Sequence, residues 1–275
     1  MIPLKDNLSC KTFPVVTLLL IALNAIAFGI ELLVPQAQVE QFFQTWAMVP
    51  ASMTHAFASG SISAIAMSLL TVLTAMFLHG GWSHIIGNMI FLQAFGRAVE
   101  GRLGRVKYLL FYILGGFAAW GLHYFTDPTS MAPALGASGA IAAVLGAYLV
   151  FYPKAEFKTL FITPLPVLAV VRAYWLLIVW IAMQLFSGVG GLLHPAADGG
   201  GVAYWAHIGG FLFGMIIAGV YATMKPVSSI CYTSLTCNCS CKGNCAKKGL
   251  HKFEFVKFWQ TSKPSCGGGD HHHHD

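Results

Sequence analysis

The chain has 275 residues, of which 56% are hydrophobic and only 9% are charged, and its mean hydropathy is +0.68. This composition excludes an ordinary soluble globular protein and predicts an integral membrane protein. The formal net charge of +6 does not indicate nucleic-acid binding, because the Lys and Arg residues are spread over short links and a tail, as orientation in a bilayer requires.

Six apolar runs predict six transmembrane helices, and therefore an all-α polytopic membrane protein. Each run is close to the ~20 residues that cross a ~30 Å hydrocarbon core, and the fourth is the shortest. The first run does not end in a small-residue cleavage pattern, so we interpret it as a helix and not as a signal peptide. The runs lie at 14–34, 76–96, 106–125, 136–152, 165–187 and 203–223.

We divide the chain into an N-terminal segment (1–13), a membrane domain (14–224) and a basic, Cys-rich tail (225–275). A further apolar run at 61–78 could be a seventh crossing, but the positive charges argue against it. With six helices, all 16 Lys and Arg residues fall on one side of the membrane, and the segments 35–75, 126–135 and 188–202 on the other side contain none.

The positive-inside rule then predicts that both termini are cytoplasmic. We expect the segment 35–75 to form a long external loop, part of which dips into the outer leaflet or lies on it. A bacterial inner membrane is the location that we expect for such a protein.

Four polar residues near the outer ends of three helices form the candidate site. The helices at 76–96, 136–152 and 203–223 all run from outside to inside, so their N-terminal ends share the outer half of the bilayer. Ser138 reaches the required depth only if the preceding loop, DPTSMAPALG, dips into the protein. The four residues are His84, Asn88, Ser138 and His207.

Small residues recur every four positions on two of these helices. In lipid, such stripes allow two helix backbones to approach closely, and this packing would place Ser138 beside His207. His84 and Asn88 are four residues apart and share a helix face. The stripes are Ser138, Ala142 and Gly146 on one helix and Ala206, Gly210, Gly214 and Ala218 on the other.

This set of side chains predicts acyl transfer to water. Neutral His207 can accept the hydroxyl proton of Ser138 as a general base, which makes the serine a nucleophile. His84, Asn88 and the backbone N–H of Ser138 can then stabilise the oxyanion. Each residue alone has an ordinary structural interpretation, as a packing serine, a core histidine or an interhelical hydrogen bond; their convergence favours catalysis.

The motifs GASG, AHIGGFLFG and HGGWSHIIGNM, the last followed by FGRAVEGRLG, together resemble the rhomboid family of intramembrane serine proteases over residues 14–223. The resemblance implies a six-transmembrane-helix rhomboid-like bundle in which Ser138 is the nucleophile, His207 is its base, and His84 and Asn88 contribute to the oxyanion hole. It implies no metal, no organic cofactor and no nucleic acid. Its expected partners are transmembrane protein substrates and membrane lipids.

Two positions carry further expectations from this resemblance. Ala142 stands where some members have an aromatic ring that stacks on the catalytic histidine, which leaves open what orients His207. Glu100 matches a structural acid of the family, and we expect it to cap a helix and tether a loop. His79 lies near the aqueous boundary and is either an interfacial residue or a further residue of the site, and Trp82 is interpreted as an interfacial anchor.

Two alternative functions are kept: a non-catalytic relative that binds transmembrane helices, and a transporter with a metal-sensing tail.

The tail itself has two interpretations. Cys237, Cys239, Cys241 and Cys245 could bind zinc or copper(I), or the tail is a basic, membrane-proximal segment without a metal. The terminal GGGDHHHHD is either an added tag or a natural histidine-rich end, and we infer no function from it.

Overall fold

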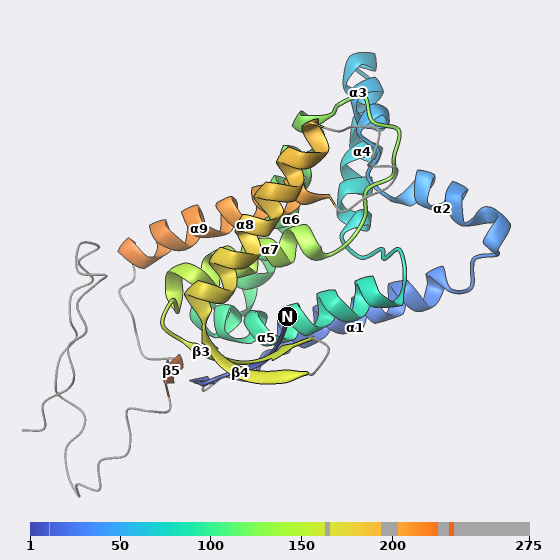
Figure 1. Cartoon of the computed structure of the whole chain (residues 1–275). Coiled ribbons are helices and arrows are strands. Elements are labelled where there is room, and N and C mark those ends of the chain that lie inside the picture. The colour runs from blue at the N-terminus through green and yellow to red at the C-terminus, as the bar shows by residue number, and fades with distance from the viewer. Residues whose placement is uncertain (11, 163–165, 194–202, 225–230, 234–275) are drawn as a thin grey trace, which may run out of the picture. The chain divides into compact units, whose positions relative to one another are not determined.

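The structure is a computed structural model that describes residues 1–10, 12–162, 166–193, 203–224 and 231–233. Most of these residues are helical (Figure 1). The candidate cysteine ligands and the terminal histidines of the tail lie outside the described residues. The helices are α1 (Val15–Glu31), η1 (Gln36–Gln38), α2 (Val39–Trp46), α3 (Pro50–Ser59), α4 (Ile62–Ala75), α5 (Trp82–Leu103), α6 (Arg105–Thr126), α7 (Ser138–Phe151), α8 (Ala173–Leu193) and α9 (Tyr204–Met224).

Within the described residues, three helices are long and apolar enough to cross a membrane, namely α6, α8 and α9. A fourth span is added if α1 and residues 36–46, which meet at a bend of 106°, are counted as one. Helix α5 has 22 residues but is less apolar, and α7 has only 14 residues. The chain is therefore a multi-pass helical membrane protein. The predicted number of six spans is not confirmed, because three or four of them meet the criteria of length and hydropathy among the described residues.

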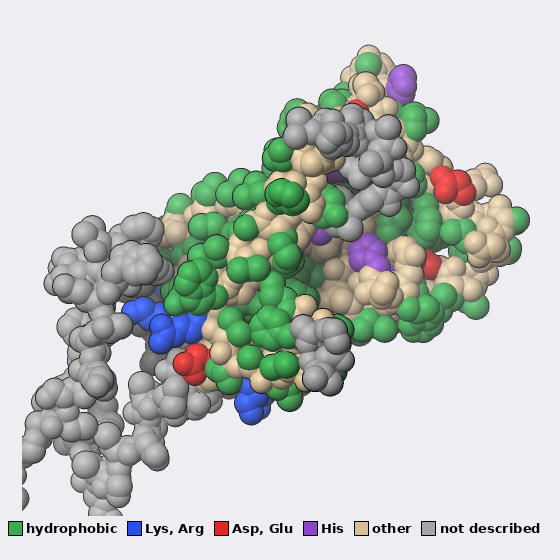
Figure 2. Space-filling model, in the orientation of Figure 1, with side chains coloured by type: hydrophobic (Ala, Val, Ile, Leu, Met, Phe, Trp, Pro, Cys, Tyr) green, Lys and Arg blue, Asp and Glu red, His purple; other side chains and the backbone are tan. Residues whose placement is uncertain are grey.

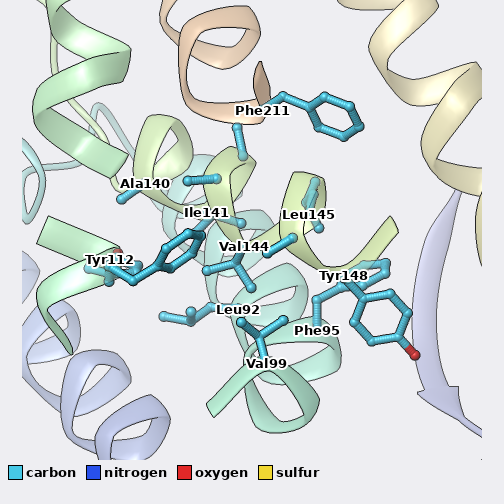
Figure 3. Packing of buried hydrophobic residues seen from close by; sticks show 14 of the residues in the cluster. Leu92, Phe95, Val99, Tyr112, Ala140, Ile141, Val144, Leu145, Tyr148 and Phe211 are labelled. Atoms are coloured by element: carbon cyan, nitrogen blue, oxygen red, sulfur yellow. The ribbon is translucent and has the colours of Figure 1, made fainter. Parts of the chain in front are cut away.

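Helix α7 lies in the middle of the helical packing. Ten of its residues, Gly139 to Tyr148, are buried. In Figure 3, Leu92 of α5 and Tyr112 of α6 lie beside Ile141 and Val144, and Phe211 of α9 lies on the opposite side of α7; all belong to one buried hydrophobic cluster. Because neighbouring helices enclose α7, it needs neither the length nor the lipid-facing surface of an isolated span.

The stripes of small residues on α7 and α9 bring the two backbones together, as predicted. A Cβ atom added to Gly210 would lie 2.1 Å from the carbonyl oxygen of Gly139, and one added to Gly214 would lie 1.9 Å from that of Ala143. No side chain fits at either distance. The small residues therefore set the separation between the helix that carries Ser138 and the helix that carries His207.

A small antiparallel sheet corrects the all-α prediction. Strands β1 (Ile2–Asp6), β3 (Glu156–Phe161) and β4 (Val167–Arg172) pair in the order β1-β3-β4. A second pair joins β2 (Leu8–Cys10) to β5 (Cys231–Thr233). The predicted helix at 165–187 was wrong in its first part, because β4 occupies 167–172 and α8 begins at Ala173. A short Val-rich run fits strand or helix equally well by hydropathy alone.

The predicted helix at 76–96 is displaced along the chain. Helix α5 begins at Trp82 and continues to Leu103, beyond the apolar run. Its polar end is held by contacts with the N-terminal region. Arg97 pairs with the buried carboxylate of Asp6 in β1. Residues 76–81, in turn, connect α4 to α5.

Glu100 caps the N-terminus of α1, as the sequence suggested. Its carboxylate accepts hydrogen bonds from the backbone N–H of Val16 at 2.9 Å and of Thr17 at 2.8 Å, and from the Thr17 hydroxyl at 2.7 Å. Two of the backbone donors that a helix start leaves unpaired are satisfied in this way. The contact ties the end of α5 to the start of α1.

The segment 35–75, which we expected to be a loop, is mostly helical, because it contains α2, α3 and α4. In Figure 1, α3 and α4 stand at the opposite end of the helices from β3 and β4. The Lys and Arg side chains visible in Figure 2 gather toward the end with the strands, and hydrophobic side chains cover most of the helices on this face. The described part of the chain thus has a basic end and an opposite end formed by α3 and α4.

Candidate active site

Ser138 is the first residue of α7, and the loop before it is fixed by backbone hydrogen bonds. Met48 and Ala134 form an antiparallel bridge with N···O distances of 3.0 and 2.8 Å. The N–H of Gly136 donates to the carbonyl of Ala75 at 2.8 Å. The loop therefore lies against the link between α2 and α3 and against the end of α4, and it presents Ser138 at a helix start.

His207 lies in the first turn of α9 and contacts Ser138 directly. Its Nε2 atom is 2.7 Å from the Oγ atom of Ser138. The imidazole is buried, with 8% of the residue exposed, and the serine is half-buried. The structure thus brings together the two residues that the sequence proposed as nucleophile and base.

The second ring nitrogen of His207 contacts a residue that the sequence analysis missed. Its Nδ1 atom is 2.8 Å from Oε1 of Gln184 in α8. Trp180, one turn earlier on α8, packs its ring against the imidazole with centroids 5.6 Å apart. The aromatic contact that Ala142 cannot make therefore comes from another helix. The feature of the sequence that could have indicated this contact is the pair Trp180 and Gln184, which are four residues apart in an apolar run and so share a helix face.

His84 lies near the start of α5 and faces Ser138 across Gly136. Its Nδ1 atom accepts a hydrogen bond from the N–H of Gly80 at 3.3 Å, so the ring proton is on Nε2. A Cβ atom added to Gly136 would lie 2.8 Å from Nε2 of His84 and 3.5 Å from Oγ of Ser138. The N–H donor of His84 and the serine hydroxyl therefore border the same space.

Asn88 lies one turn after His84 on α5 and is also buried, with 8% of the residue exposed. Among the described residues, its Nδ2 atom has no hydrogen-bond partner. A buried amide donor without a partner is costly, which makes it a candidate to bind a group that arrives with the substrate.

His79, which the sequence left as either an interfacial residue or a further residue of the site, is buried inside the protein, with 1% of the residue exposed. Its ring meets that of His84 edge to face at 5.1 Å, and its backbone N–H donates to both carboxylate oxygens of Glu31 at 3.1 Å. Burial, with a smaller contribution from the nearby His84, lowers the pKa of His79 to about 4. His79 therefore supports the ring of His84 as a neutral group. Trp82 is exposed.

The arrangement can move a proton from a hydroxyl to an imidazole beside two N–H donors. Within the described ranges, no group of three or more His, Cys, Asp or Glu residues could hold a metal ion. The contact between Ser138 and His207 allows nucleophilic attack assisted by a general base.

Comparison with known proteins agrees with the geometry. The family model of the Rhomboid domain matches residues 66–223. The chain is 29% identical over 153 residues to "Rhomboid protein 1, mitochondrial" of Saccharomyces cerevisiae, which covers 54% of this chain and 41% of that protein. It is 35% identical over 78 residues to "Putative rhomboid protease YdcA" of Bacillus subtilis, covering 28% and 39% of the two chains.

A third relative, "RHOMBOID-like protein 6, mitochondrial" of Arabidopsis thaliana, is 31% identical over 157 residues, or 57% of this chain and 45% of that protein. The chain thus spans less than half the length of each of these curated relatives. The domain match nevertheless covers more than half of the chain and includes Ser138, His207, His84 and Asn88. The chain therefore belongs to the rhomboid family.

Proposed function

We propose that this protein is an intramembrane serine endopeptidase that hydrolyses peptide bonds in or near the transmembrane helices of other membrane proteins. The observation that carries the proposal is the 2.7 Å contact between Nε2 of His207 and Oγ of Ser138. Membership of the rhomboid family supports it, as does the name "Putative rhomboid protease YdcA" given to one relative.

In the proposed reaction, Oγ of Ser138 attacks the carbonyl carbon of the scissile bond while its proton moves to Nε2 of His207. The carbonyl oxygen becomes an oxyanion, which the N–H groups of His84, Asn88 and the Ser138 backbone stabilise. The imidazolium then gives its proton to the leaving nitrogen, and the C–N bond breaks. The product is an acyl-enzyme and a free amine.

Water completes the cycle. His207 takes a proton from a water molecule as the water oxygen attacks the acyl carbon, and the same donors stabilise the second oxyanion. The carbonyl re-forms, the bond to Oγ breaks, and the serine recovers its proton. The carboxylic acid product leaves, so that one water molecule is consumed for each peptide bond cleaved.

The membrane domain at 14–224 is proposed to cross the membrane six times, with α1, α5, α6, α7, α8 and α9 as the spans. The positive-inside rule then places the basic end, the N-terminal segment 1–13 and the tail 225–275 in the cytoplasm. Several curated relatives are mitochondrial or chloroplastic, so the comparisons do not favour the bacterial inner membrane that we expected.

The proposal is tested with detergent-solubilised protein, a fluorophosphonate probe that labels activated serines, and a model transmembrane substrate. Wild-type protein should take up the probe and cleave the substrate. Ser138→Ala should do neither, and His207→Ala should lose at least 100-fold in rate, since general-base catalysis contributes about 100-fold to 10,000-fold. Ser63→Ala is the matched control, because Ser63 is exposed on α4.

Cleavage by Ser138→Ala at the wild-type rate would remove the proposed reaction. Binding of the model helix without cleavage by the wild-type protein would favour the non-catalytic alternative. Transport of a metal ion that survives Ser138→Ala would favour the transporter.

A further inference from the structure

Gln184 lies in the middle of α8 and is buried, with 9% of the residue exposed. Its Oε1 atom is 2.8 Å from Nδ1 of His207, while Nε2 of the same ring is 2.7 Å from Oγ of Ser138. The imidazole is thus held between an amide on one helix and a hydroxyl on another. A polar side chain in an apolar helix is unfavourable unless it makes such a bond.

The hydrogen bonds fix the orientation of the amide. The Nε2 end of Gln184 donates to the backbone carbonyl of Trp180 at 3.4 Å. The carbonyl end therefore faces His207, and an oxygen atom can only accept. Nδ1 of His207 must carry the ring proton to make this bond, which leaves the lone pair on Nε2 directed at Ser138.

Trp180 restricts the plane of the imidazole. The two ring centroids are 5.6 Å apart with an interplanar angle of 37°, and Trp180 also packs on Phe211 with centroids 6.0 Å apart. Trp180 and Gln184 are four residues apart, so they lie on one face of α8. This face of α8 contacts the ring by packing and by a hydrogen bond.

We propose that Gln184 is a positioning residue, which holds His207 in the tautomer and orientation that allow it to accept the proton of Ser138. The inference rests on the proposed protease function and deepens it, because it names the third group of the site. The role matches that of the acid in a Ser-His-Asp triad in orienting the imidazole. It differs in charge, because a neutral amide orients the ring but adds no negative charge beside the imidazolium.

This difference makes the role testable by pH. The titratable side chains that act on His207 are His84 of α5 and His123 of α6, while α7 and α8 contribute the uncharged Ser138 and Gln184. A carboxylate at position 184 would still accept the Nδ1 proton, and it would also stabilise the imidazolium. The acid limb of the rate profile of Gln184→Glu should therefore move to higher pH.

The experiment compares Gln184→Leu, Gln184→Glu and wild type in full-length protein, with Met183→Leu, an exposed position on the same turn of α8, as the control. Gln184→Leu should lower kcat roughly 10-fold to 100-fold, a part of the general-base contribution, with KM within about 2-fold. Fluorophosphonate labelling should slow by a similar factor. Gln184→Glu should recover most of kcat and shift the acid limb upward.

Wild-type kcat in Gln184→Leu would overturn the inference. So would an equal loss in Gln184→Leu and Gln184→Glu with no shift of the acid limb, because a purely structural role predicts that result. If Gln184→Leu does not fold, the pH profile of Gln184→Glu tests the role of Gln184: a shift of the acid limb to higher pH supports the role, and no shift refutes it. Ser138→Ala is measured in parallel: its inactivity beside an unaffected Gln184→Leu would refute only the role of Gln184, whereas its activity would refute the proposed protease itself.

Discussion

Gly136 lies directly beside His84, since a Cβ atom at Gly136 would sit 2.8 Å from Nε2 of that histidine. The φ angle of Gly136 is 128°, which L side chains rarely adopt. The glycine two residues before Ser138 therefore has two functions. It permits the turn into α7, and it leaves open the space that His84 and the serine hydroxyl share.

We expect Gly136→Ala to reduce substrate cleavage more than 10-fold, because the new methyl group displaces His84 and fills the space beside Ser138. Cleavage of the model substrate and probe labelling measure the loss. Gly60→Ala is the matched control, because Gly60 also has a positive φ, of 65°, but an added Cβ atom meets nothing within 4 Å. Equal activity of the two variants would contradict this account of Gly136.

Asn88→Ala is expected to lower kcat by about 100-fold to 1,000-fold, the usual cost of removing one oxyanion donor. KM should change little, because the donor binds the oxyanion more strongly than the substrate carbonyl. Steady-state kinetics with the model substrate separate the two effects. A raised KM with normal kcat would show instead that Asn88 binds substrate in the ground state.

Gly214→Ala is expected to destabilise the protein by about 1–3 kcal/mol, the typical cost of forcing an extra carbon into a packed interface. The reason is that the new Cβ atom would lie 1.9 Å from the carbonyl oxygen of Ala143. Thermal unfolding in detergent measures the change. Gly219→Ala on the same helix has open space within 4 Å and should leave the unfolding temperature close to that of wild type.

Glu100→Ala is expected to lower the free energy of unfolding by about 1–3 kcal/mol for each buried donor left without a partner. The backbone N–H groups of Val16 and Thr17 both lose their acceptor, and both residues are buried. Glu40→Ala removes an exposed carboxylate and serves as the control. The folded fraction of Glu100→Ala should keep the wild-type rate per molecule, and a loss of kcat in that fraction would contradict a purely structural role.

Hydropathy located several helices closely. The runs at 106–125 and 203–223 correspond to α6 (Arg105–Thr126) and α9 (Tyr204–Met224). It placed α5 too early, because apolar runs mark lipid contact, whereas α5 extends through polar residues that bind other elements. The pairing of β3 with β1 was not predictable, because it depends on partners far apart in the sequence.

The candidate site could be predicted only in part, because some of its contacts also depend on partners far apart in the sequence. Ser138 lies on one stripe of small residues and His207 directly follows Ala206, the first residue of the other, and sequence reveals the regular spacing of both stripes. Gln184 has no such pattern, and its importance depends on which way α8 faces when it packs on α9. That orientation is a property of the tertiary structure, so sequence alone does not show that the amide meets the imidazole.

The sheet at the basic end has a consequence for biogenesis. Asn7, just after β1, donates its backbone N–H to the carbonyl of Glu156, 149 residues later in the sequence. During synthesis the ribosome releases β1 long before its partner exists, so β1 must wait until β3 has been made. Closure of this sheet is therefore a late step of assembly, and a bulky fusion placed directly before Ile2 should hinder it.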